Sequence, residues 1–354
     1  MPGSGSDRSP PVRRRNHMGK ISNSISHYLS DNRRFADLFN GICFQGEAVV
    51  RAEELSDGTQ VYYGAMEDPA GEYQGKKPKG RKERTRDICK QLKTGGTLRI
   101  LAVENQEMVD YTMPYRCMEY DVMQYGKQID ILRKRNRQES HPGNIAEKIG
   151  GIKKEDRLTP VYTICLYHGV DAWDGPRTLG EMMDFGGEED VFRKIFKDYP
   201  MQLYCLNEDK DLEVFRTEVG LLFQALQYRG DRTGLRNLME RDTRYQSIDE
   251  DTLETMSVML SLPSIWKKRE KYMEKNEEDK EEYDMCQAIR EWAEEERSIG
   301  REEGFMKGQQ AGSDEKARII VRNMLMRSMT DSDIMAIAEC DQEFIDTVRS
   351  GLSV

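Results

Sequence analysis

Apolar positions in the first part of the chain fall into runs that predict a buried sheet. The clearest run is 97–106, Thr-Leu-Arg-Ile-Leu-Ala-Val-Glu-Asn-Gln, which has the near-continuous apolar character of a buried strand. A second strand-like run precedes it at 85–92, and Gly95 and Gly96 between the two runs are a turn signal. We therefore expect a hairpin of two paired strands.

Polar side chains occur near the end of the strand predicted at 97–106, although the strand is expected to be buried. Glu104 and Gln106 are two positions apart, so they share a face of the strand. Burying a polar group without a partner costs on the order of 2–7 kcal/mol. If the two runs pair, Asp87 approaches Glu104. Two carboxylates and an amide then meet at one sheet edge, where a metal ion would satisfy them.

Asp87 followed by Glu104-x-Gln106 resembles the core motif of the PD-(D/E)XK nucleases. More narrowly, the chain resembles the recombination-promoting nucleases, a PD-(D/E)XK transposase-like family in which Gln commonly replaces the motif's Lys. The resemblance covers most of residues 25–240. It includes a first core helix, the helix after the catalytic strand, the next core strand and its following loop, at 34–41, 113–126, 155–169 and 173–176.

The resemblance implies an α/β fold with a PD-(D/E)XK restriction-endonuclease-like core, in which helices flank a mixed central sheet, followed by an all-helical C-terminal extension. Asp87 and Glu104 would hold Mg²⁺, or Mn²⁺, through their hard carboxylate oxygens. Gln106 would position the attacking water by hydrogen bonds, because an amide takes up no proton. On the first helix Asp37 would supply an outer acid, with Asn40 and Glu47 as alternatives.

Arg116, Tyr120 and Gln124 recur every four residues after Pro114, so they form one stripe of a helix. In the family a similar Arg and Tyr pattern follows the catalytic strand. We expect Arg116 and Tyr120 to support the site, and two interpretations stay open for them: direct participation, or packing and capping alone.

Two basic segments flank these residues. Lys82, Arg84 and Arg86 end a basic run that leads into Asp87, and a second run covers 133–137. Both are expected to hold a DNA backbone without reading its sequence. Alternatively the first is a solvated loop and the second a helix end stabilised by cations. The net charge of −10 argues against a protein coated in nucleic acid, so we expect any DNA contact to depend on the local distribution of charge.

Composition indicates a soluble, cytoplasmic protein with no membrane partner. The apolar share is 37% and no run of eighteen apolar residues occurs. The seven cysteines are odd in number and widely spaced, which predicts reduced thiols. The four histidines lack ligand spacing, so His168 is expected to be structural. Residues 1–17 lack the apolar region of a signal peptide and are expected to be a disordered tail.

The domain organisation follows from these patterns. A nuclease-like domain is expected over 18–240, a charged helical connector over 241–298, and a Gly/Glu-rich helix with a small helical module over 299–354. Gly300, Gly304, Gly308 and Gly312 recur every four residues, which fits either a close helix–helix approach or a loosely ordered segment. The resemblance also includes a Gly- and Glu-rich repeat here, and it implies a homo-oligomer formed through the C-terminal helices and not a flexible linker. The terminal module has a layout similar to a helix-turn-helix, but its last helix is acidic, which favours packing over base recognition.

The resemblance implies a metal-dependent DNA endonuclease, a hydrolase of phosphodiester bonds with low sequence specificity, associated with DNA recombination or mobile elements. The alternative is a catalytically inactive nuclease-fold protein that binds DNA or a protein partner and serves in assembly.

Overall fold

The computed structural model describes residue 21 and residues 23–63, 83–139, 144–186, 191–208 and 211–351; the side chains of 61–63 and 83–84 are not described. The expected disordered tail, 1–17, and Lys82 lie outside the described residues. The chain divides into two compact units, Met1–Gln287 and Ala288–Val354.

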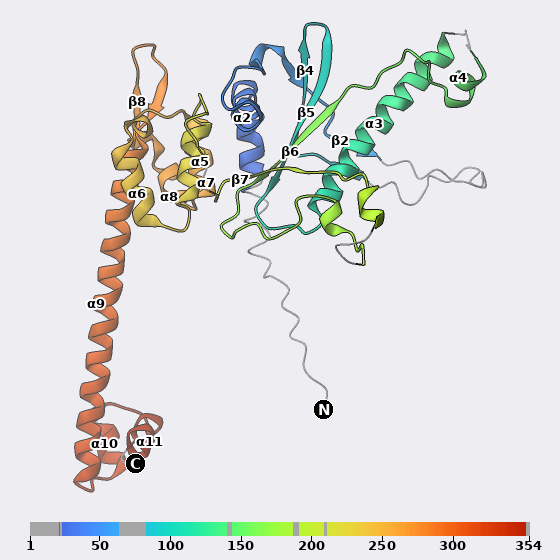
Figure 1. The fold of residues 1–354 in the computed structure, drawn as a ribbon. Coiled ribbons are helices and arrows are strands. Elements are labelled where there is room, and N and C mark those ends of the chain that lie inside the picture. The colour runs from blue at the N-terminus through green and yellow to red at the C-terminus, as the bar shows by residue number, and fades with distance from the viewer. Residues whose placement is uncertain are drawn as a thin grey trace. The chain divides into compact units, whose positions relative to one another are not determined.

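The first unit is built on a five-stranded mixed sheet (Figure 1). Its strand order is β1-β4-β5-β6-β7. β1 pairs antiparallel with β4 and β4 with β5, whereas β5, β6 and β7 run parallel. The α/β class and the mixed central sheet are as expected from the sequence. The strands are β1 (Leu55–Asp57), β4 (Ile88–Thr94), β5 (Thr97–Gln106), β6 (Val161–Tyr167) and β7 (Gln202–Cys205).

The hairpin expected around Gly95 and Gly96 is present. Thr94 pairs with Thr97, so only the two glycines form the turn. Their φ angles are 56° and 81°, in the left-handed region that a tight two-residue hairpin turn requires and that glycine adopts without steric cost. The turn therefore fixes which residue of β4 lies opposite which residue of β5.

Helices cover both faces of this sheet (Figure 1). α2 (Asn32–Phe44) lies on one face and begins at Asp31, whose carboxylate accepts from two backbone amides of the first turn. α3 (Met113–Gln138) lies on the other and has Pro114 in its first turn. Beneath α3 the buried residues include Cys89, Ile100 and Val161, with Tyr125 of α3 packed against them.

Shorter elements complete the first unit. Two small hairpins are formed by β2 (Val61–Tyr63) with β3 (Glu83–Thr85) and by β8 (Met273–Lys275) with β9 (Glu281–Tyr283). Its other α-helices are α4 (Ile145–Gly150), α5 (Val219–Gln227), α6 (Arg232–Arg241), α7 (Glu250–Met259) and α8 (Pro263–Lys267). Its 3-10 turns are η1 (Ala52–Glu54), η2 (Gly180–Met182), η3 (Val191–Lys194), η4 (Thr243–Gln246) and η5 (Arg269–Lys271).

Residues 241–298 are not the helical connector that their charge suggested. They form α7, α8, the β8–β9 hairpin and the start of α9 (Met285–Met326). Arg34 of α2 is buried and forms ion pairs with Asp249 at 2.5 Å and Asp251 at 3.1 Å. Tyr283 of β9 is also buried and pairs with Ile248. These contacts explain why the first unit extends to Gln287 and does not stop near 240.

The second unit consists of most of α9 with α10 (Asp331–Ala338) and α11 (Gln342–Ser350). Val321, Ile334 and Ile345 form its buried core. Thr330 caps α10 and Asp341 caps α11, each accepting a hydrogen bond from a backbone amide of the first turn. No described helix is both long and apolar enough to cross a membrane.

Asp37 is a structural residue in this fold. Its carboxylate is buried on α2 and accepts hydrogen bonds from the backbone amides of Arg216 and Thr217 and from the Thr217 hydroxyl, at 2.7–3.0 Å. These bonds hold the chain that leads into α5. These contacts give Asp37 a structural role, and its expected role as an outer acid of the site stays a prediction. Of the two alternatives, Asn40 is hydrogen-bonded to the backbone at 49–50 and Glu47 is exposed.

Replacing Asp37 should destabilise the protein. We expect Asp37→Ala to lower the free energy of unfolding by about 2–3 kcal/mol, because the substitution leaves buried amides without an acceptor. Asp37→Asn should lose less, and the exposed Glu47→Ala should stay within about 0.5 kcal/mol of the wild type. Urea unfolding measures all three. Unchanged stability of Asp37→Ala would contradict the structural role.

Candidate functional site

The site lies where the end of β5 meets the residue before β4. Ile88 pairs with Val103, so the same register places Asp87 opposite Glu104. Opposite residues of an antiparallel pair point to the same face. Asp87 is further held by a hydrogen bond of 2.7 Å, donated by the backbone amide of Asn105 to its Oδ2. The structure thus brings together the two carboxylates that the sequence singled out.

Glu104 carries the strongest electrostatic signal of the site. Its side chain is 1% exposed, and its Oε1 has no hydrogen-bond partner among the described residues. Burial, and then the charge of Asp87, raise the pKa of Glu104 to about 8, against the opposing effect of Arg86 and Arg116. At neutral pH this carboxyl therefore retains its proton unless a cation takes the proton's place.

The other carboxyl of the pair is perturbed in the same direction. Burial raises the pKa of Asp87, and this is opposed by the hydrogen bond from Asn105 and by the charge of Arg116. Two neighbouring carboxyl groups that repel each other, and whose pKa values are raised by burial, are typical of a site that binds a cation.

The first turns of α3 supply the side chains that face this pair. Arg116 is half-buried and forms an ion pair of 2.6 Å with Asp110, which fixes its guanidinium at the site's edge. Tyr120 is buried one turn later and is hydrogen-bonded to Arg116. The charge of Glu104 acts on both Arg116 and Tyr120. The stripe predicted from the sequence is therefore directed at the carboxylates.

Gln106 follows Glu104 on the same face of β5, in register with Tyr167 of β6. Its side chain is half-buried. Its backbone carbonyl accepts a hydrogen bond of 2.9 Å from the amide of His168, so the backbone is fixed on the side of β6 as well. Gln106 thus stands at the outer end of the row that begins with the buried Glu104.

Arg86 is buried, which corrects the expectation that it contacts a DNA backbone. Its side chain is fully enclosed and forms an ion pair of 2.6 Å with Asp121 of α3. The guanidinium also donates to the Thr163 hydroxyl at 2.7 Å. Tyr199 donates to the second oxygen of Asp121 at 2.6 Å. The resulting buried network joins α3 to the sheet directly below the carboxylates.

Asp121 is the main residue that sequence reasoning missed. It lies five positions after Arg116 and follows Tyr120 directly, on the buried side of α3. An acid on the apolar side of a helix is a detectable signal, because such a group needs a buried partner. The sequence did not reveal that the partner is Arg86, since this depends on how α3 crosses the sheet.

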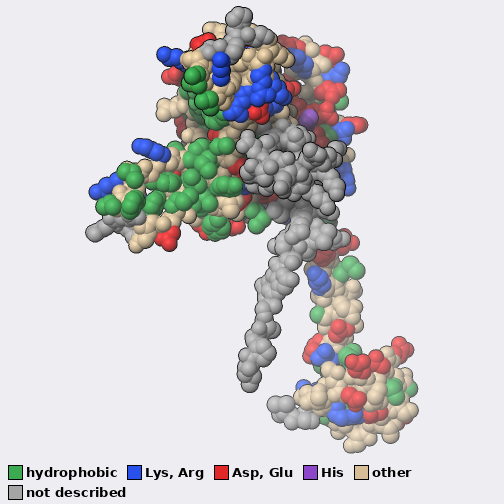
Figure 2. Space-filling model, turned by 90° about the vertical axis from the view of Figure 1, so that its right-hand side faces the viewer, with side chains coloured by type: hydrophobic (Ala, Val, Ile, Leu, Met, Phe, Trp, Pro, Cys, Tyr) green, Lys and Arg blue, Asp and Glu red, His purple; other side chains and the backbone are tan. Residues whose placement is uncertain are grey.

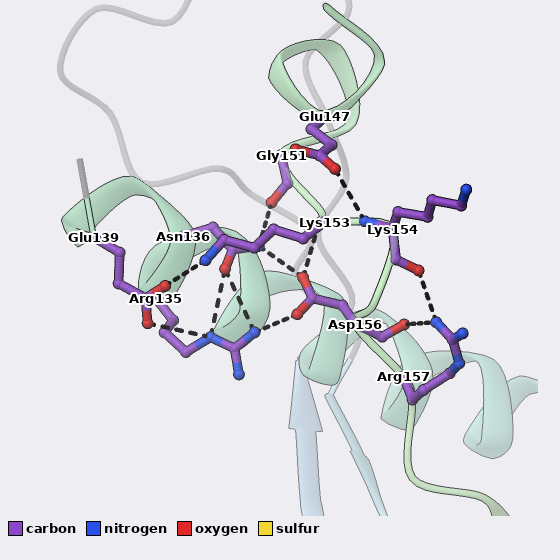
Figure 3. A network of polar contacts seen from close by, with 9 residues as sticks. All are labelled: Arg135, Asn136, Glu139, Glu147, Gly151, Lys153, Lys154, Asp156 and Arg157. Atoms are coloured by element: carbon purple, nitrogen blue, oxygen red, sulfur yellow. Dashed lines mark hydrogen bonds and ion pairs between the residues drawn. The ribbon is translucent and has the colours of Figure 1, made fainter. Parts of the chain in front are cut away.

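The two basic runs have different outcomes. Lys82 and the side chain of Arg84 lie outside the described residues. The second run ends α3, where Arg135 forms an ion pair with Asp156 and Asn136 donates to Asp156 at 2.7 Å (Figure 3). Lys153 pairs with Glu139 at 2.5 Å in the same network. Part of the second run therefore holds the end of α3 to the segment after α4.

Cations remain exposed at this end of α3 nevertheless. Figure 2 views the molecule from the side to which α3 and α4 extend in Figure 1, and Lys and Arg side chains gather there. Lys134 and Arg137 form no ion pair with another described residue. The exposed Lys and Arg of this basic patch are Lys134, Arg135, Arg137, Lys148, Lys154 and Arg157.

The cysteines and the buried histidine have no evident chemical role. All seven cysteines are free thiols, as predicted. His168 is 3% exposed; burial and, to a lesser degree, the nearby Arg229 lower its pKa to about 4. It is therefore neutral at pH 7, which is consistent with the expected structural role.

The donor set at Asp87 and Glu104 fits a divalent cation. In the described part of the chain no three His, Cys, Asp or Glu side chains gather closely enough to hold a metal ion by themselves. Mg²⁺, however, is usually bound by one or two carboxylates together with waters and a substrate phosphate. The unpartnered Oε1 of Glu104 is the observation that matches such an ion.

Comparison of the chain with protein-family models, with curated proteins and with solved structures finds no match.

The raised pKa of Glu104 predicts a pH-dependent stability. The unfolded chain ionises this carboxyl near its ordinary pKa of 4.5, whereas the folded protein retains the proton until about pH 8. The metal-free protein should therefore lose stability as pH rises from 4.5 to 8, by at most about 1.4 kcal/mol per pH unit from this group. Glu104→Gln should remove this loss.

Thermal unfolding with EDTA at pH 5 and pH 8 measures the effect. Glu104→Gln should be more stable than the wild type at pH 8, and that advantage should shrink at pH 5. The exposed Glu53→Gln should follow the wild type at both values. An advantage that does not depend on pH would show that Glu104 is ionised normally.

Proposed function

We propose that this chain is a metal-dependent DNA endonuclease of the PD-(D/E)XK type, related to the recombination-promoting nucleases. The observation that carries the proposal is Glu104, which is buried, has no hydrogen-bond partner for Oε1 among the described residues, and lies directly across the hairpin from Asp87. A protein that needed this region only for stability would gain from replacing such a carboxylate, because burying it costs free energy.

Asp87 and Glu104 would hold Mg²⁺ or Mn²⁺. When bound, the ion stabilises the negative charge that develops on the phosphate and lowers the pKa of a bound water. To hold the cation, Glu104 would have to be ionised. Gln106, on the same face, orients the attacking water by hydrogen bonds but takes no proton from it. Arg116, held by Asp110, offers a fixed positive charge to the phosphate.

The basic patch at the end of α3 supports DNA as the substrate. Arg116 and Lys134 are separated by eighteen residues of one helix, a distance of roughly 27 Å at 1.5 Å per residue. That distance corresponds to about eight base pairs of a duplex. The cations would contact phosphates and not base edges, which agrees with low sequence specificity. We propose action in the cytoplasm, in recombination or the movement of mobile elements.

A second candidate is a non-catalytic nuclease-fold protein that binds DNA or a partner. One observation favours it: Asp37, the acid expected from the first helix, is used for structure, which leaves two carboxylates at the site. For either candidate we also propose self-association through the C-terminal helices.

Nicking of supercoiled plasmid DNA tests the first candidate. We expect the wild type to nick DNA with Mg²⁺ and not with EDTA. Asp87→Asn and Glu104→Gln should lose at least about 100-fold in rate, the scale typical of removing electrostatic stabilisation of a transition state. Asp130→Asn, on the exposed side of α3, is the matched control and should cut like the wild type. Absence of cutting by folded wild type would favour the second candidate, and equal cutting by all variants would exclude this site.

Charge reversal in the basic patch tests DNA binding separately from cleavage. Lys134→Glu with Arg137→Glu should weaken binding of a duplex by about tenfold or more and reduce the slope of log affinity against log salt by about two. Fluorescence anisotropy at several salt concentrations measures both quantities. The same reversal at exposed Lys93 and Lys267 should have less effect. Equal effects of the two pairs would show that the patch has no special role.

A further inference from the structure

The middle of α9 is a helix that no described part of its own chain covers. Every residue from 294 to 316 is exposed. A β-carbon added at Gly300, Gly304, Gly308 or Gly312 would meet nothing within 4 Å. Each glycine costs a helix about 0.5–1 kcal/mol relative to alanine, and helices in proteins owe most of their stability to packing. This segment of roughly 35 Å therefore lacks, among the described residues, the packing that would hold it.

The charges along the segment have a mirror-like order centred on Met306. Reading outward in both directions from this residue, three charged positions below it meet a residue of opposite sign at the same separation above it. The pairs are Arg297 with Glu315, Glu296 with Lys316, and Glu294 with Arg318. The other charged residues from 294 to 318 meet uncharged ones, so no two like charges are brought level. The same reading brings Gly304 level with Gly308 and Gly300 level with Gly312.

We propose that α9 pairs antiparallel with α9 of a second copy of this chain, about a two-fold axis level with Met306. Arg297 then lies opposite Glu315 of the partner subunit, and the symmetry produces the contact twice. Successive residues are about 100° apart around a helix, so Arg297, Glu315 and the four glycines lie within one face roughly 120° wide. Met306 is on the opposite side. The glycines let the two backbones approach closely, and the charges at the ends set the register.

Two other arrangements bring like charges together. A parallel pair in register places every charge opposite its own copy. Shifting the antiparallel pair by one turn keeps glycine opposite glycine, and one such shift sets Arg301 against Lys307 and Glu294 against Asp314. Like charges repel, which disfavours both arrangements. The shift in the other direction sets Ile319 against Arg297 and Arg301 against Glu315, so only the register centred on Met306 makes the dimer depend on Arg297.

Within one chain, neither Arg297 nor Glu315 forms an ion pair with another described residue. Both side chains are exposed and remain available to a partner. The proposal concerns the second unit alone and does not depend on a nuclease activity in the first.

Solution mass of the full chain, measured by analytical ultracentrifugation over a range of concentrations, tests the pairing. The wild type should dimerise. Arg297→Glu and Glu315→Arg should each weaken the dimer by about tenfold or more, because each creates two like-charge contacts. The double variant that carries both substitutions should recover the wild-type affinity, and an equal mixture of the two single variants should form a mixed dimer.

Glu302→Arg is the matched control for Glu315→Arg. It makes the same change of charge on the same helix, but roughly 140° away around the axis, and should leave the dimer intact. Circular dichroism checks that each variant retains its helix. A monomeric wild type at all concentrations, or a double variant that dimerises no better than the single ones, would overturn the proposal. Plasmid nicking by the same variants is read separately and bears on the first unit only.

Discussion

The pairing of β4 with β5 is the constraint on which the site depends. Asp87 directly precedes β4 and Glu104 lies near the end of β5. The two residues are neighbours only because of the register in which these strands pair. Side chains alternate between faces along a strand, so a slip of one residue would send one of the two carboxylates to the face covered by α2. The site is thus a property of the alignment of two strands, and α3 only covers it.

A buried ion pair near Glu104 joins α3 to the sheet. Arg86 and Asp121 form this pair, Thr163 donates to the same oxygen of Asp121 as Arg86 does, and Tyr199 donates to the other oxygen. Removing one partner of such a pair is far more damaging than replacing both, because it leaves a buried charge alone. The network keeps α3 close enough to the sheet for Arg116 and Tyr120 to reach the carboxylates.

The sequence predicted the features that local rules determine. Two glycines between apolar runs specify a hairpin, a Pro in the first turn marks the start of α3, and a four-residue period directs Arg116 and Tyr120 to one side of it. The sequence did not reveal the structural role of Asp37, because its partners, Arg216 and Thr217, are 179 and 180 residues away. Arg86 was misassigned for a similar reason. It belongs to a basic run and was expected to be exposed, because its ion-pair partner, Asp121, lies on another element. The β8–β9 hairpin was missed because its segment is highly charged and has the buried Tyr283 as its main apolar signal.

The turn at Gly95 and Gly96 touches neither carboxylate, yet its length is as much a part of the site as they are. Seven pairs of residues lie between the turn and the site, and the last of them is Ile88 with Val103. The next pair outward is Asp87 with Glu104. A chain lengthened by one residue at this turn would contain every side chain discussed above, and the same apolar runs would still form a sheet. The acids would no longer meet. In this fold an insertion at the turn would therefore separate the two carboxyl groups as effectively as the substitution of one of them, so the length of the turn constrains the site as much as the identity of the acids does.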